Sequence, residues 1–157
     1  MKKVLLLAVS VLTAAMVIPA AFAGSTPVNK VNGDVTFTNM GLTQHWVFMA
    51  QDLGNGAAKG SVLDEYNGGT TISKVISAKV LDAKHAQFTT EVTSSVNNPW
   101  AQVGDQFHYT VYDKGEGSNA NGVDYMHYDG FTRGGVDYPG GGDYPITSGN
   151  IQIHFEG

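Results

Sequence analysis

Histidines are the residues of this chain with the most evident metal chemistry, and there are five of them: His45, His85, His108, His127 and His154. The last three fall on the polar sides of segments in which apolar and polar residues alternate, and Asp124 and Asp129 lie near them in the sequence. Imidazoles and carboxylates that converge on one face would bind zinc or copper. No His-x-His spacing brings two of them together, and pairing across strands explains such histidines as well. The sequence favours this structural interpretation.

A second candidate metal site consists of the carboxylates of Asp113, Glu116, Asp124 and Asp129. Hard carboxylate oxygens are the ligands that calcium prefers, and the neighbouring glycines and asparagines would let backbone carbonyls turn inward. The spacing matches no EF-hand, however, and ordinary turn chemistry accounts for the same residues. Calcium therefore stays an alternative to a turn, and no cofactor is predicted.

Aromatic residues supply the candidate binding residues Trp100, Tyr138 and Tyr144. Each of the two tyrosines precedes a proline in a glycine-rich stretch, where not every aromatic ring can be core. Exposed aromatic side chains on a rigid β scaffold commonly contact carbohydrate or protein. Alternatively, this stretch folds over one end of a barrel as a plug. Core packing accounts for Trp46 and Tyr109.

Catalytic signatures are missing from the sequence. Serines and histidines occur, but no nucleophile elbow or related motif places them together. The adjacent pair Asp64 and Glu65 would point to opposite sides of a strand, so it does not form the paired carboxylates of a glycosidase. We therefore predict that the protein is not an enzyme.

The first 23 residues have the three parts of a secretory signal peptide. Two lysines precede an apolar stretch over 4–17, and Ala21-Phe22-Ala23 provides a small-x-small cleavage site. A membrane-spanning helix is the alternative, but it needs roughly 20 apolar residues. We expect cleavage after Ala23, which leaves one domain over 24–157, either secreted or periplasmic.

The composition of the expected mature chain excludes several classes of function. Loss of the two lysines in the leader leaves seven basic against 14 acidic residues, a formal charge of −7. This balance argues against nucleic acid and anionic membrane surfaces as partners. The absence of cysteine excludes thiol chemistry, cysteine-ligated zinc and iron–sulfur clusters. The mature chain has no Asn-x-Ser/Thr acceptor, as is typical of a bacterial product.

Period-two alternation, bounded by Gly, Asn and Asp, predicts an all-β fold. The predicted strands cover 34–39, 44–51, 59–66, 70–82, 85–93, 105–113, 123–131 and 148–157. About eight antiparallel strands indicate a single β-barrel or β-sandwich. A helix over 73–88 is the competing interpretation, and its many β-branched residues argue against it.

Three segments carry more specific expectations. The run 44–51 is apolar at nearly every position, so we expect it to be buried on both faces or to face a ligand on one. The spacing in 70–82 breaks between Ile72 and Val75, which predicts a bulge or two short strands. Seven glycines and two prolines in 130–149 predict a long loop.

The C-terminal segment is unusually well patterned for a chain end. Ile151, Ile153 and Phe155 share one face of an extended strand. In a small closed β fold, the last strand pairs with a distant earlier strand, so its apolar face becomes core. We therefore predict that this segment closes the sheet.

The motifs GNIQIHFEG, DQFHYTVYDKGEG and VDYMHYDGF resemble a family of bacterial secreted β domains called post-COAP. Domains of that family end in a Gly-Asn-Ile-Gln strand and carry an Asp-x-Gly-Glu turn, matched here by Asp113, Gly115 and Glu116. The chain departs from the pattern at Gly117, where the family has proline, and in its glycine-rich insert over 132–147. The resemblance implies an exported all-β domain without established catalytic residues.

Two functions are compatible with these features, and a third is disfavoured. The first is an exported non-enzymatic β domain that binds an unknown protein, carbohydrate or small ligand, or that supports a surface assembly. The alternative is a small β-barrel that binds a small apolar ligand in its interior. An outer-membrane barrel would need strands of roughly 9 to 11 residues with an apolar outer band, and most predicted strands are shorter. No membrane span is therefore expected after cleavage of the leader.

Overall fold

The computed structural model describes residues 29–115 and 122–156, and within them the fold is all-β without helix. The expected signal peptide and Glu116 lie outside the described residues. The strands are β1 (Asn29–Asn39), β2 (Leu42–Asp52), β3 (Ala58–Tyr66), β4 (Gly69–Asp82), β5 (His85–Val96), β6 (Gln106–Tyr112), β7 (Tyr125–Arg133), β8 (Val136–Pro139) and β9 (Asp143–His154). The described part of the chain contains no helix long and apolar enough to cross a membrane.

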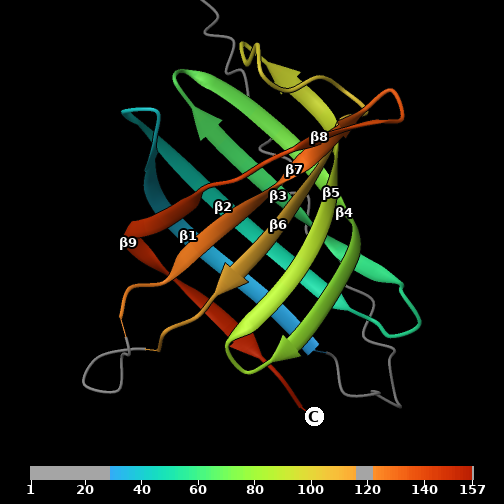
Figure 1. Cartoon of the computed structure of the whole chain (residues 1–157), viewed down its shortest axis with the longest axis vertical. Coiled ribbons are helices and arrows are strands. Elements are labelled where there is room, and N and C mark those ends of the chain that lie inside the picture. Colours follow the sequence, from blue (N-terminus) through green and yellow to red (C-terminus); the bar gives the residue numbers. More distant parts are fainter. Residues whose placement is uncertain (1–28, 116–121, 157) are drawn as a thin grey trace, which may run out of the picture.

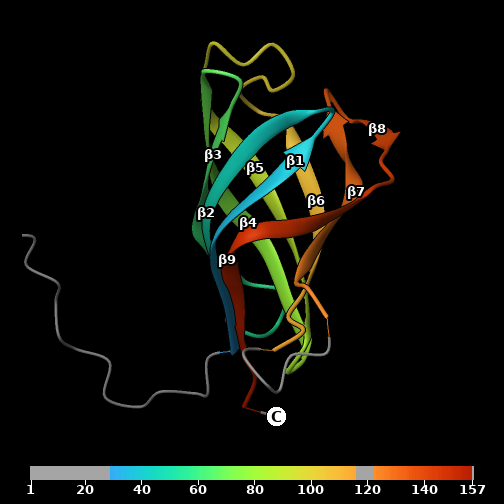
Figure 2. The same ribbon diagram turned by 90° about the vertical axis from the view of Figure 1, so that its left-hand side faces the viewer.

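Eight of these strands form a closed antiparallel barrel. Neighbouring strands pair in chain order from β1 to β7, and β9 then pairs with both β7 and β1. In Figure 1, β4, β5 and β6 cross in front of β1, β2 and β3, and Figure 2 shows the same barrel from the side. The short strand β8 pairs only with β7 and lies outside the ring. The structure thus decides for a barrel over a sandwich.

The C-terminal strand closes the barrel, as predicted. Residues 146–154 of β9 pair with β1 in a register that places Val31 opposite Ile153, and 143–145 pair with the start of β7. Ile151 is fully buried. The prediction is wrong for Phe155, because β9 ends at His154 and the phenylalanine ring is exposed.

Inward-facing side chains of every barrel strand make one core. The alternation predicted for β5 is confirmed, with Ala86, Phe88, Thr90 and Val92 buried. In β2, by contrast, only alternate residues face inward: Trp46 and Phe48 are buried, whereas Val47 and Met49 are exposed. Of the two alternatives for this run, burial on both faces is therefore wrong, because the barrel has a single interior, and a ligand-facing side stays a prediction.

The segment 73–88 is a β-hairpin, so the helical alternative is wrong. Strands β4 and β5 pair along their length up to the register Asp82 opposite His85. The pairing register shifts between Ile72 and Ser73, which confirms the bulge predicted between Ile72 and Val75, and it shifts again between Val75 and Ser77. β-branched residues pack well on a pleated strand and lose rotamer freedom in a helix, and this preference decides between the two structures.

The predicted loop over 130–149 is also wrong, because most of it is strand. Gly134 and Gly135 have φ angles of 59° and 80° and form the two-residue turn between β7 and β8. Gly130 and Gly140 lie where paired backbones approach closely: a Cβ at Gly130 would be 2.5 Å from the Tyr138 carbonyl oxygen. These glycines therefore permit pairing, and they do not interrupt it.

Candidate functional site: the barrel interior

The barrel encloses a cavity of about 630 Å³. It lies toward the end of the barrel formed by the β1–β2 turn, the β3–β4 turn, the loop 97–105 and the β7–β8 hairpin. Exposed residues at its edge, Met40 and Trp100, mark the opening, which we call the mouth. A barrel of eight strands is just wide enough to hold one small ligand if its side chains do not fill it.

Aromatic rings form much of the cavity wall. The barrel strands β2, β3, β6, β7 and β9 contribute the rings of Trp46, Tyr66, Phe107, Tyr109, Tyr128, Phe131 and Tyr144. The centroids of Trp46 and Tyr109 are 4.6 Å apart with nearly perpendicular planes, and those of Tyr109 and Tyr128 are 6.0 Å apart. Such edge-to-face packing holds the rings in fixed orientations. The wall is therefore largely apolar and rigid, and the side chains of Thr71, Ser73 and Thr90 add polar groups to it.

One carboxyl group faces this apolar space, that of Asp64 on β3. In the described part of the chain, Asp64 is the only acidic residue that lines the cavity. Burial raises its pKa to about 6, because removal from water disfavours the charged form. Glu65, the next residue, raises the pKa further by repulsion, while a hydrogen bond from Gln44 lowers it.

Asp64 has polar neighbours on both adjacent strands: Gln44 and Trp46 on β2, and on β4 the buried Thr71, which lies opposite Asp64 in the register. The Gln44 Nε2 atom donates to Asp64 Oδ1 at 2.7 Å. Trp46 lies directly opposite Asp64 in the strand register. The buried indole Nε1 atom of Trp46 has no hydrogen-bond partner of good geometry within the described residues. It still lies near the Asp64 carboxylate and lowers the pKa of that group. No ion pair involves Asp64 in the same residues.

Two tyrosines of the wall stay protonated well above neutral pH. Burial raises the pKa of Tyr128 to about 12, and Tyr144 and Asp105 contribute by charge repulsion. Burial also raises the pKa of Tyr109 far above its ordinary value, with a further contribution from Asp64. Both phenols are therefore neutral at neutral pH, and the carboxyl of Asp64 is the acidic group of the cavity that ionises there.

An ion pair between the partly exposed Arg133 and the buried Asp105 fixes the loop at the mouth. Arg133, at the end of β7, donates from Nε to Asp105 Oδ1 at 2.8 Å and from Nη2 to Oδ2 at 2.6 Å. Its Nη2 atom also donates to the Trp100 carbonyl oxygen at 3.1 Å. Burial alone would raise the pKa of Asp105, but the Arg133 guanidinium and the Gln102 amide outweigh it and lower the pKa. The pair joins the loop 97–105 to β7 across the opening.

The three predicted binding residues lie at one end of the barrel. The ring of Tyr144 lines the cavity, and Trp100, 66% exposed, stands at the mouth. Tyr138 lies outside on β8 and stacks on Phe131, whose ring lines the cavity, with centroids 4.7 Å apart. The structure thus brings Tyr144 and Trp100 to one site. Tyr138 is separated from the cavity by the ring of Phe131.

The carboxylates predicted for calcium bind backbone amides. Asp124 accepts from the amides of Lys114 and Ile151, at 2.7 and 2.8 Å. Asp113 accepts from Gly115 and, at 3.2 Å, from Ile153. Both residues therefore fasten the β6–β7 connection to β9. Asp129 accepts a hydrogen bond from the Thr110 hydroxyl instead.

The histidines considered as zinc or copper ligands have separate partners. His108 contacts the Thr89 and Thr132 hydroxyls, His127 lies 2.7 Å from Asp143, and His154 lies 2.7 Å from Glu156. Among residues 29–115 and 122–156, no group of three or more His, Asp or Glu side chains is placed to hold a metal ion.

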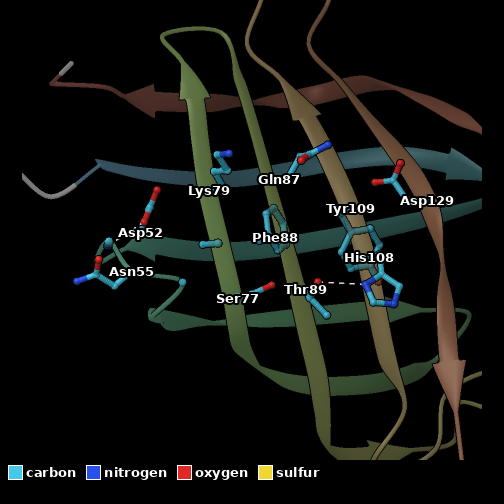
Figure 3. Close-up of a pocket in the computed structure, with 13 residues that line it drawn as sticks. Asp52, Asn55, Ser77, Lys79, Gln87, Phe88, Thr89, His108, Tyr109 and Asp129 are labelled. Atoms are coloured by element: carbon cyan, nitrogen blue, oxygen red, sulfur yellow. Dashed lines mark hydrogen bonds between the residues drawn. The ribbon is translucent and has the colours of Figure 1, made fainter. Parts of the chain in front are cut away.

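A second hollow, of about 700 Å³, lies along β4, β5 and β6 next to the β2–β3 turn (Figure 3). Several of its polar side chains already bind partners within the protein. Thr89 and His108 are joined at 3.1 Å, and Gln87 donates to Thr110, which donates to Asp129.

The sequence pattern does not indicate Asp64 and Gln44 as site residues. It placed Asp64 and Glu65 on opposite sides of a strand, and the structure confirms this: Glu65 faces outward and bonds His45 at 2.8 Å. The available signal was the alternation in β3, where Asp64 shares its face with the buried Val62 and Tyr66. An acid in an apolar row is unusual unless something pairs with it.

Comparison of the chain with family models, with curated proteins and with solved structures gives no match. The resemblance to post-COAP domains stays a prediction, and the barrel interior is the feature from which a function is inferred.

Proposed function

We propose that this protein is an exported, non-enzymatic binding protein that holds a small, largely apolar ligand inside its barrel. The observation that carries the proposal is the 630 Å³ cavity with aromatic walls and an opening at one end. Small-molecule sites typically measure about 300 to 1,000 Å³ and combine apolar walls with a few polar groups.

The interior suits this role better than the outer surface does. Its rings are held against one another, so a ligand would lose its water-exposed surface without first ordering the wall. Export is proposed from the N-terminal 23 residues, and the absence of a catalytic motif supports binding without chemistry. Trp100 and Met40 at the mouth would contact the ligand as it enters.

The test is uptake of a neutral apolar fluorescent probe, N-phenyl-1-naphthylamine, by the chain from residue 24. We expect the probe to bind at about one per chain, with the increase in fluorescence that follows removal from water. Thr90→Phe should reduce the affinity at least about tenfold, because the inward-facing Thr90 lines the cavity and the larger ring would occupy it.

Thr93→Phe is the matched control, since Thr93 lies on the same strand but is exposed. It should bind the probe like the unmodified protein. Ser73→Leu, also inside the cavity, provides a second filled variant if Thr90→Phe does not fold. Absence of uptake by the folded unmodified protein, or equal uptake by inner and outer variants, would contradict the proposal.

A further inference from the structure

We infer that the ligand carries a positively charged amine, which binds at Asp64 while its apolar part contacts the aromatic wall. This inference rests on the proposed function and adds the chemical class of the ligand. It starts from the unusual position of Asp64, a carboxylate that faces an apolar lumen and has no cationic partner among the described residues.

Burial of a carboxylate is unfavourable unless hydrogen bonds or an opposite charge compensate for the lost water. Asp64 receives only partial compensation, from the Gln44 amide and from the nearby Trp46 indole. Desolvation remains the largest influence on its pKa, which is raised. An ammonium group in the lumen would supply the missing partner.

The cation has to come from outside the chain. Arg133 is the only basic residue among the described residues that line the cavity. Its Nε and Nη2 atoms donate to the buried carboxylate of Asp105, at 2.8 and 2.6 Å, so its charge is already paired. Reorientation toward Asp64 would leave Asp105, which is 2% exposed, without its partner. The cavity therefore has an acidic group and no free basic one.

The wall around Asp64 also suits a cation. Trp46 and Tyr109 lie with their centroids 4.6 Å apart, and Trp46 faces Asp64 across the β2–β3 pairing. The faces of Trp and Tyr rings attract ammonium groups, most strongly where water is excluded. The overall negative charge of the chain adds a long-range attraction for cations. An anionic ligand would be repelled both by the faces of the aromatic rings and by the negative charge of the chain.

The experiment compares three ligands that share one ring system and differ in their polar group: 2-naphthylmethylamine, 2-naphthalenemethanol and 2-naphthoate. Calorimetric titrations at about pH 7.5 keep the amine charged and Asp64 ionised. We expect the amine to bind at least about tenfold more tightly than the alcohol, and the carboxylate to bind most weakly.

Asp64→Asn should remove most of the amine preference and change alcohol affinity less than about twofold, because the amide keeps the size of the side chain and loses its charge. Glu65→Gln is the matched control. It removes a charge one residue away on the outer face, where Glu65 bonds His45, and should leave the preference intact. Melting temperatures confirm that each variant is folded.

The other outcomes separate this inference from the proposed function. Equal binding of amine and alcohol would overturn the inference that the ligand carries an amine, and it would leave the proposal of ligand binding in the cavity intact. Tighter binding of the alcohol, lost in Asp64→Asn, would assign an uncharged hydrogen-bond donor to Asp64 instead. A loss of amine preference in Glu65→Gln equal to that in Asp64→Asn would show a general charge effect and overturn the site. Failure of all three ligands and of the neutral probe would contradict the proposed function itself.

Discussion

The ionised carboxylate of Asp64 destabilises the folded protein, because it has lost part of its hydration. Its folded-state pKa is raised to about 6, above the ordinary carboxyl value, so the folded protein binds its proton more tightly than the unfolded chain does. The contribution of this group to stability is therefore greatest below about pH 4 and is lost as the pH rises through 6. A buried group that destabilises the fold at neutral pH is typical of a functional site.

Asp64→Asn should stabilise the protein at pH 8 by up to about 3 kcal/mol, which is the free energy of a pKa change of about two units. The gain should shrink steadily as the pH falls from 7 and vanish below about pH 3, where Asp64 is protonated in both states. Urea unfolding of both proteins across this range measures it. A difference that does not depend on pH would show that the carboxylate is not desolvated.

Arg133 and Asp105 at the mouth form the opposite case, a buried charge that has its partner. Arg133→Met should destabilise the protein by about 3–5 kcal/mol, because Asp105 would stay buried without compensation. Lys74→Met is the control: it breaks the Lys74–Glu91 pair, which is largely exposed, and should change stability by less than about 1 kcal/mol. Equal effects in chemical denaturation would contradict this account of the mouth.

At several points in the strands only glycine fits the backbone, and Gly149 in β9 is an example. It lies opposite Val35 of β1 with a φ of 89°, next to the register shift in that pairing. A Cβ there would be 1.9 Å from the Asp34 carbonyl oxygen. Both the backbone conformation and the close approach therefore exclude a side chain at this position.

Gly149→Ala should lower the free energy of unfolding by about 3 kcal/mol or more, since the added methyl group displaces β9 from β1. Gly104→Ala separates the two causes. Gly104 has a similar φ of 93° but open space around it, so it should show only the backbone penalty of about 1 kcal/mol. Similar losses in thermal melts of the two variants would mean that the close approach has no effect.

At the level of the strands, the sequence predicted positions well and misjudged one glycine-rich segment. Alternation located β2 to β7 to within a few residues, because one buried face imposes a period of two. The segment 130–149 was predicted as a loop, since glycine content alone does not distinguish a turn from close pairing. The Gly134-Gly135 dipeptide between alternating residues was the signal for the hairpin.

Closure of the barrel depends on β9, the last strand of the described residues. β9 contributes Ile151 to the core, and its amides at Ile151 and Ile153 bind Asp124 and Asp113. Without β9, both β1 and β7 lose a pairing partner. The two ends of the described chain are therefore joined by direct sheet pairing.

Truncation after Thr147 should prevent formation of the native barrel, because β1 would keep an unpaired edge and the core would open at Ile151. We expect loss of the cooperative thermal transition and association of the product in size-exclusion chromatography. Replacement of the exposed Phe155 by serine is the control, since it keeps β9 whole and should melt nearly unchanged. A truncated chain that melts cooperatively at the original temperature would contradict the role of β9.

For the whole molecule, the sequence supported the class of fold but not the site. An apolar alternating terminus indicated closure, whereas barrel and sandwich remained equally compatible because both need the same pattern. The cavity was not predictable, since it arises where inward residues from many strands leave space. Trp100 and Tyr144 were found as aromatic residues, while Asp64 was missed because its significance depends on what surrounds it.

Strand β8 remains outside the ring, and its outer edge presents backbone groups that no barrel strand covers. Such an edge can recruit a strand from another molecule and start sheet growth. Here the strand has four residues, carries Asp137 and ends in Pro139, which has no amide hydrogen to donate. Replacement of that proline would lengthen the available edge, so its ring helps to keep neighbouring copies from joining sheet to sheet.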